Sequence, residues 1–298
     1  MEAWRAAGLV LALCAGPLHA ETRCADYVPQ AKPQNTAREE VGVDLDTILE
    51  RGFIEFALYE DFAPWSFEEG GRAKGIDVEI GEMIAESLGV TAKFQLVTPG
   101  ETLEADLRNW VWKGPVVSGH VANVMLHVPY DSNFTCRVEQ VTFTGLYHVE
   151  EVAIAYRADL YPDGGPTPAY FRFDTVAVEN DSIADFYLSS FPGGQLSGNV
   201  QRLKSTTQAM AALARGEVKA AMGPKGELEA GLVPGLKVHT PPLPGFAVGK
   251  WTLGVAVHFA WKDVAYAVDD ALGAAIADGR MAAIFARYGV SFNAPELR

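Results

Sequence analysis

The hydrophobic pattern of the chain is clearest in its first third. Bulky apolar residues alternate with smaller or polar ones over Phe53–Tyr59, which predicts a half-buried strand. Gly70-Gly71 predicts a turn after it. From Gly75 onward, apolar side chains recur on one face of a helix that we expect to end near Gly89. This stretch therefore predicts a strand, a turn and a helix in succession.

Strand-like and helix-like segments alternate along the rest of the chain. Further strands are expected at 91–97, 121–128, 149–157, 175–178, 200–203, 218–222 and 251–259. Further helices are expected at 41–51, 101–112, after Ser182, at 206–215, 263–277 and 281–288. This alternation predicts α/β layers around a mostly parallel sheet.

The strand–turn–helix unit occurs twice, which predicts two lobes. One unit begins near Phe53 and the other near Val176. We expect a first lobe of residues 43–150 plus 253–298 and a second lobe of residues 151–252. A ligand site in such a fold lies in the cleft beyond the carboxyl ends of the strands.

The first twenty residues indicate a cleaved secretory signal peptide. Arg5 precedes an apolar run, and Ala20 places a small residue before the expected cleavage point. Residues 21–42 are polar and predict an irregular arm. No later segment is long and apolar enough to be transmembrane, so we expect a soluble periplasmic protein.

The net charge of the chain argues against two classes of binding partner. The formal net charge is −14 at pH 7. An acidic exported protein is poorly suited to bind nucleic acid or an anionic membrane surface. We therefore expect neither as a partner, nor membrane insertion after the signal is removed.

Two cysteines remain once the signal peptide is removed. Cys24 and Cys136 are candidates for a disulfide in an oxidising compartment, where they would tie the arm to the body. Two free buried thiols are the alternative. The chain has neither a Cys-x-x-Cys nor a Cys-x-x-Cys-His motif, which argues against dithiol redox chemistry and c-type haem attachment.

Several segments together resemble family 3 of the extracellular solute-binding proteins, the type II periplasmic binding proteins of amino-acid ABC transporters. The resemblance covers about residues 43–290. It is carried, in this order, by LDTILERGFIEFALYEDFAPWSF, GIDVEIGEMIAESLGV, MAALARGEVKAAMG and DDALGAAIADGRMAAIFARYG. It implies a two-lobed fold that closes on a small solute. In such proteins aromatic residues pack on the ligand, a Thr and an Arg bind its carboxylate, and an Asp binds its amino group.

The resemblance carries over to some positions and fails at others. Phe62 and Trp65 match the aromatic wall, and Arg137 has the spacing of the carboxylate-binding Arg. The family's Thr is replaced by Phe134, and the Asp of its second-lobe Asp-Ala pair is replaced by Lys219. A buried zwitterion needs a partner for each of its charges. An ordinary amino acid is therefore not the expected ligand.

A second resemblance concerns a shorter segment. VWKGPVVSGHVANVMLHVPYD is similar to binding-protein-like accessory proteins encoded beside quinoprotein (PQQ-dependent) methanol and alcohol dehydrogenases. It implies the same two-lobed fold in a protein that assists a periplasmic dehydrogenase in methanol oxidation. The expected partners are a small-molecule ligand and either an ABC transporter permease or such a dehydrogenase.

Six residues are candidate ligand contacts, each with an ordinary structural alternative. Arg137 offers a fork for a carboxylate, or a surface ion pair with Glu139 or Glu150. The others are Asp61 (a turn cap), Phe62 and Trp65 (packing at the strand end), His127 (a structural histidine) and Ser182 (a helix N-cap).

Catalytic and cofactor signals are weak. The sequence has no Gly-x-Ser-x-Gly, P-loop or His-Glu-x-x-His motif, and its six histidines lack metal-binding spacing. We expect a binding protein with no cofactor or metal and no enzymatic activity. A periplasmic lyase or dehydratase on the same fold is the alternative, and it would need a cleft carboxylate as acid or base.

Overall fold

The computed structural model describes residues 24, 27–28, 41–117, 119–246 and 248–296. The predicted signal peptide (1–20) and most of the predicted arm (21–42) lie outside these residues. In the described part, no helix has both the length and the apolar character needed to cross a membrane.

One mixed sheet of nine strands runs through the molecule, and a two-stranded hairpin lies beside it. The order is β4-β1-β5-β11-β6-β9-β7-β8, with β10 also paired to β6. The strands are β1 Phe53–Tyr59, β4 Thr91–Val97, β5 Val124–Tyr130, β6 Val141–Arg157, β7 Val176–Glu179, β8 Val200–Leu203, β9 Ala220–Pro224, β10 Leu236–His239 and β11 Lys250–His258. The hairpin joins β2 Phe67–Glu69 to β3 Arg72–Lys74 through the expected Gly70-Gly71 turn.

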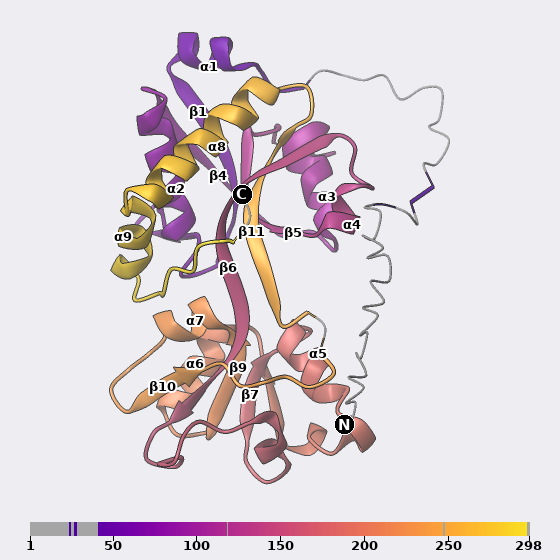
Figure 1. The fold of residues 1–298 in the computed structure, drawn as a ribbon, viewed down its shortest axis with the longest axis vertical. Helices are drawn as coiled ribbons and strands as arrows, with labels where there is room; N and C mark the ends of the chain where they lie inside the picture. The colour runs from indigo at the N-terminus through magenta and orange to yellow at the C-terminus, as the bar shows by residue number, and fades with distance from the viewer. Residues whose placement is uncertain (1–23, 25–26, 29–40, 118, 247, 297–298) are drawn as a thin grey trace, which may run out of the picture.

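Figure 1 shows two bodies joined by the long strands β6 and β11. The sheet is parallel where β4, β1 and β5 pair in the upper body, and where β9, β7 and β8 pair in the lower one. It is antiparallel where β6 and β11 join these blocks. Strand β6 begins eight residues before the predicted strand at 149–157. Thr142, Thr144 and Gly145 interrupt the apolar pattern of its first half, so the sequence did not predict that half. A register irregularity lies in the same half, opposite Leu253–Val255.

Helices cover both faces of the upper block. One face carries α1 Leu45–Arg51, α2 Ile76–Ser87, α8 Lys262–Ala277 and α9 Arg280–Arg287, whose apolar sides form a core with the strands. The other face carries α3 Leu103–Leu107, the π-helix η1 Arg108–Trp112 and the short α4 Ser132–Thr135. The predicted cap at Asp44 is present, since its side chain accepts a hydrogen bond from Thr47 N.

The lower block has two smaller cores of its own. Helix α5 Ile183–Ser189 packs in one, and α6 Thr206–Ala214 and α7 Lys225–Ala230 pack in the other. Short 3₁₀ turns lie at Pro168–Arg172, Pro192–Gly194 and Ser197–Asn199. The sequence did not predict α7 or β10, because both are short and lie among Gly and Pro residues.

The carboxyl ends of the parallel strands in both blocks point to the space between the blocks. Strands β1 and β5 run antiparallel to β11, so Tyr59 and Tyr130 lie at the end of the upper block where β11 enters it from the lower body. Strands β7 and β9 run upward from the lower body, so Glu179 and Pro224 face the same space. Carboxyl ends of parallel strands are where ligands bind in such sheets.

Gly75 provides a test of how this region is built. Its φ is +127°, and a Cβ there would lie 2.2 Å from the Trp65 carbonyl oxygen. We expect Gly75→Ala to lower the free energy of unfolding by about 2–4 kcal/mol, because backbone atoms cannot give way easily. Urea denaturation measures this loss. The matched control is Gly198→Ala, where a Cβ meets nothing within 4 Å, and an equal loss in both variants would refute the explanation.

Candidate functional site

An aromatic cluster lines the upper body at the space between the two blocks. The Phe62 ring lies 4.9 Å from the His127 ring, and the Trp65 ring lies 4.6 Å from it, both measured between centroids. Asp61 precedes them in an exposed turn with a φ of +52°. Four of the predicted site residues, Asp61, Phe62, Trp65 and His127, are thus brought together. Trp65, however, is only 1% exposed.

Backbone hydrogen bonds fix the loop that carries Trp65. Trp65 N donates to the Phe62 carbonyl oxygen at 2.8 Å. The first helical residues of α2 then donate back, Ile76 N to the carbonyl of Pro64 and Asp77 N to that of Trp65. The N-terminal N–H groups of a helix have no partner within the helix, and here the loop provides one. The indole is therefore held by main-chain geometry as well as by packing.

A buried carboxylate holds His127 in place. Asp77 is fully buried, and its side chain is 3.0 Å from His127 Nδ1. The Tyr147 hydroxyl donates to the other oxygen of Asp77, also at 3.0 Å. Burial, followed by the charge of Asp77, raises the pKa of Tyr147 well above its ordinary value, so this phenol stays a donor. This network is what the structural alternative for His127 predicts. The His127 ring nevertheless also packs against Trp65.

Trp65 also touches the lower body. A Cβ added to Gly226, in α7, would lie 2.7 Å from Trp65 Cζ2 and 2.8 Å from Glu150 Oε2. Gly226 N donates to that same carboxylate oxygen at 3.1 Å. The indole of the upper body, the main chain of α7 and a carboxylate of the crossing strand β6 therefore meet at one point.

Carboxyl groups gather around this contact. Burial raises the pKa of Glu150 to about 7, although backbone N–H groups of Glu151 and Gly226 hydrogen-bond to it. Burial and the nearby Glu179 raise the pKa of Glu227 to about 8. Glu179 accepts hydrogen bonds from the amide and the hydroxyl of Thr206, each at 3.0 Å.

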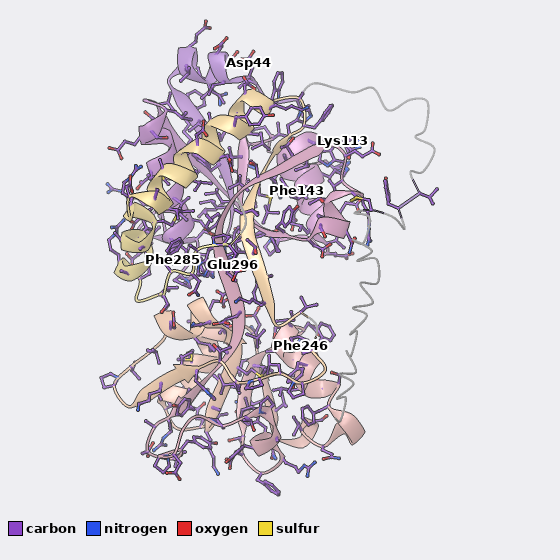
Figure 2. All side chains as sticks on the ribbon, in the orientation of Figure 1. Asp44, Lys113, Phe143, Phe246, Phe285 and Glu296 are labelled. Atoms are coloured by element: carbon purple, nitrogen blue, oxygen red, sulfur yellow. A yellow bond between two sulfur atoms is a disulfide. The ribbon has the colours of Figure 1, made fainter. Side chains whose placement is uncertain are left out.

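His148 packs against the aromatic cluster inside the upper body. It is buried, 4.5 Å from the Phe285 ring and 5.8 Å from the Trp65 ring. Figure 2 shows Phe285 on the side of the upper body that faces the lower one. Burial lowers the pKa of His148 to about 3, so the ring is neutral and contributes an apolar surface.

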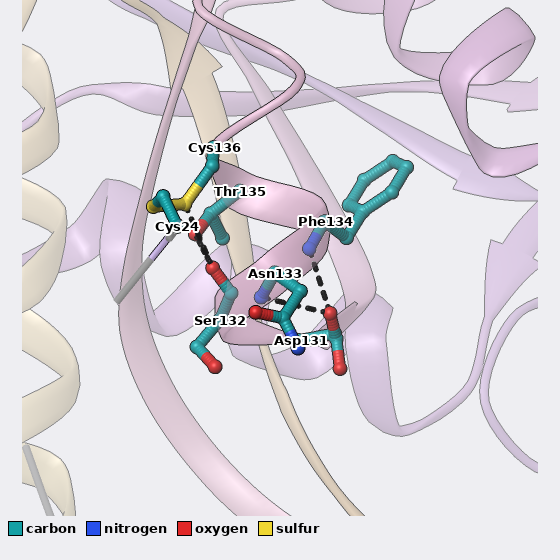
Figure 3. Close-up of a disulfide and its surroundings, with 7 residues drawn as sticks. All are labelled: Cys24, Asp131, Ser132, Asn133, Phe134, Thr135 and Cys136. Carbon is teal, nitrogen blue, oxygen red and sulfur yellow. Dashed lines mark hydrogen bonds between the residues drawn. A yellow bond between two sulfur atoms is a disulfide. The ribbon is translucent and has the colours of Figure 1, made fainter. Parts of the chain in front are cut away.

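The other two predicted contacts belong to other elements. Ser182 caps α5, where its hydroxyl accepts from Asp185 N at 3.2 Å. Arg137 is exposed and lines a hollow of about 250 Å³ with Cys24, Tyr27 and Asn133. The structure pairs Cys24 with Cys136 in a disulfide beside this hollow, with Cα atoms 6.0 Å apart (Figure 3).

A larger hollow of about 520 Å³ runs along the crossing strands. Tyr130, Glu151, Lys250, Trp251 and the C-terminal segment through Glu296 line it. Glu296 lies near the crossing strands, between the two bodies, in Figure 2. Among the described residues, no group of three or more His, Cys, Asp or Glu side chains is arranged to hold a metal ion.

Sequence reasoning missed the residues that make the inter-body contact. Asp77 was seen only as part of a helix start, and Glu150 only as an ion-pair candidate for Arg137. Gly226 and Glu227 belong to the helix that the sequence did not predict. The one available signal was the position of Gly226 and Glu227 shortly after the predicted strand at 218–222.

Comparison with solved structures identifies the architecture. An ancestral cationic amino-acid solute-binding protein matches at 17% identity and a TM-score of 0.67, over 82% of this chain and 99% of that chain. An arginine-bound ABC transporter substrate-binding protein of Streptococcus pneumoniae matches at 16% identity and a TM-score of 0.58, over 84% and 99% of the two chains. The L-cysteine receptor of Neisseria gonorrhoeae matches at 19% identity and a TM-score of 0.55, over 83% and 93%.

No family model and no curated protein sequence matches the chain. At these identities the structural likeness defines the fold. The expected fold class is therefore confirmed: this chain has the two-lobed α/β architecture of periplasmic binding proteins.

The Asp77 network provides the next prediction. Asp77→Ala removes the partner of both His127 and Tyr147 in a buried setting. We expect the free energy of unfolding to fall by about 2–4 kcal/mol, because unsatisfied buried polar groups are costly. Glu82→Ala, an exposed acid of the same helix, is the control and should stay within about 0.5 kcal/mol of wild type. Denaturant unfolding that shows equal effects for the two changes would contradict the proposed role of Asp77.

Proposed function

We propose that this chain is an exported solute-binding-type protein whose lobes close on a small polar molecule. The convergence of strand ends from both bodies on one space, under the wall of Phe62, Trp65 and His127, is the observation that carries this proposal. The proposed lobes are residues 43–150 plus 253–298 and residues 151–252. Movement would occur in β6 and β11, which join them.

The charges at the cleft favour a solute with a cationic group. Glu179 and Glu227 lie close enough for the first to raise the pKa of the second. An ammonium or guanidinium between them would offset that repulsion. The structural neighbours include a cationic amino-acid binding protein and an arginine-bound receptor, which is consistent with this choice. Arg137 lies at the disulfide, so an ordinary α-carboxylate would need another partner.

Binding is favoured over catalysis. Glu150 has the proton affinity of an acid or base, but both its oxygens accept backbone N–H groups and Trp65 covers it. The carboxylate facing Arg137 that a lyase would need is not part of this arrangement. One structural neighbour is an ancestral amino-acid-binding protein that is a precursor of cyclohexadienyl dehydratase, which links this fold to both roles.

A thermal-shift screen of the exported protein tests solute binding. The panel contains amines, basic and neutral amino acids, keto acids and short alcohols. We expect a cationic solute to raise the Tm, because it binds the folded state only. Phe62→Ala should weaken its binding by about ten-fold through loss of the aromatic wall. The control is Phe173→Ala, an exposed phenylalanine of the second lobe. A panel without any stabilising solute, or equal affinity in both variants, would contradict the proposal.

A second role, as accessory to a periplasmic quinoprotein dehydrogenase, is favoured by one exposed feature. Val116 and Val117 follow the π-helix and are 86% and 94% exposed. They lie within the segment that resembles such accessory proteins. Adjacent exposed apolar side chains of this kind are typical of protein contact sites.

A pull-down against a purified periplasmic quinoprotein dehydrogenase tests the accessory role. Replacing both valines with serine, Val116→Ser and Val117→Ser, should reduce capture several-fold, because the apolar contact is lost. The matched control is Leu232→Ser with Val233→Ser, an adjacent apolar pair of the second lobe that is 40% and 44% exposed. Absence of capture, or the same loss with either pair, would count against this role.

A further inference from the structure

The contact between the lobes is made at a buried carboxyl group. Trp65 from the first lobe packs on the main chain at Gly226 of α7, and Glu150 of the crossing strand β6, which is only 2% exposed, lies at the same point. Gly226 N donates to the Glu150 carboxylate at 3.1 Å, so this carboxyl group lies at the closing contact.

We propose that closure of the two lobes takes up a proton at Glu150, so that acid favours the closed form and base favours the open form. This inference rests on the lobe movement of the proposed function. It assigns to this carboxyl group a control of closure that requires no solute.

The geometry gives the physical reason. Opening the lobes withdraws the Trp65 indole from Gly226 and lets water reach the Glu150 carboxyl group. A carboxylate is solvated far better in water than under an indole, so its ionised form favours opening. The neutral acid carries no such cost and remains under the indole. Proton binding and closure therefore favour each other.

The surrounding charges do not cancel this effect. Around Glu150 lie Glu151 and His148 on its own strand, His127 on β5, and Lys225 and Glu227 on α7. The Lys225 ammonium is 3.0 Å from Glu151, which it pairs with, while Lys250 adds positive charge beside Glu151. His148 is held neutral by burial. Burial therefore dominates at Glu150.

The sign and range of the pH dependence follow. In the closed form the pKa of Glu150 is raised from 4.5 to about 7. Well below pH 4.5 the group is neutral in either form and leaves closure unaffected. Closure becomes less favourable as the pH rises from there through about 7, and changes little further well above it.

Distances between two spin labels test the inference without any solute. The labels are placed at Glu82 on α2 and Ala214 on α6, exposed positions on opposite lobes, with the native disulfide kept intact. We expect a short distance to predominate at pH 5.5. At pH 9 the closed-to-open ratio should be at least about ten-fold lower. A pKa difference of one unit between the closed and open forms already produces a change of that size.

Variants identify the proton. Glu150→Gln keeps the size of the side chain without the ionisable group, so the short distance should predominate at both pH values. Glu151→Gln is the matched control, because the pKa of its carboxyl is lowered and it stays ionised throughout this range. It should follow the wild-type pH profile.

Two results would overturn the inference. One is a wild-type distance distribution that is the same at pH 5.5 and pH 9. The other is a Glu150→Gln variant that keeps the wild-type pH dependence. Either result leaves solute binding to be decided by the thermal-shift screen, so failure of the proton-linked closure is distinct from failure of the proposed function.

Discussion

The arrangement of the cleft depends on the placement of one indole. Within the upper body, the hydrogen-bonded loop and the Asp77–His127–Tyr147 network hold the Trp65 ring in place. On the side of the lower body, the ring packs on the main chain of α7 at Gly226, where any side chain would collide with it. Because the indole is packed on both sides, the two lobes are joined by a rigid apolar contact in addition to their crossing strands.

This contact explains the unusual chemistry around it. An apolar ring over Glu150 excludes water, and exclusion of water is the first cause of the raised pKa of that carboxyl. Burial beside Phe285 and Trp65 likewise lowers the pKa of His148 and keeps it neutral. The exposed valines beyond the π-helix lie outside this contact and form a separate surface.

The sequence predicted the strands and helices that carry this site better than the residues that make the contact between the lobes. Strand β1 and helix α2 follow from strong local periodicity and from glycines at their ends, and both formed where expected. Phe62 and Trp65 were predicted from their match to the aromatic wall of the resembling family, and His127 from its place near the end of a predicted apolar strand; the structure brings these three rings together. Gly226 and Glu150 were not found, since their importance comes from a contact between segments 76 residues apart, which no local pattern encodes. Arg137 had the expected spacing, but the short helix α4 and the disulfide position it elsewhere.

The central claim is that Trp65 and Gly226 hold the lobes together, and small-angle X-ray scattering tests it directly. A leucine at position 226 would occupy the space of the indole, so Gly226→Leu should force the lobes apart and raise the radius of gyration above that of wild type. Gly198→Leu, on open surface of the second lobe, should leave it unchanged. An unchanged radius in a folded Gly226→Leu protein would contradict the account.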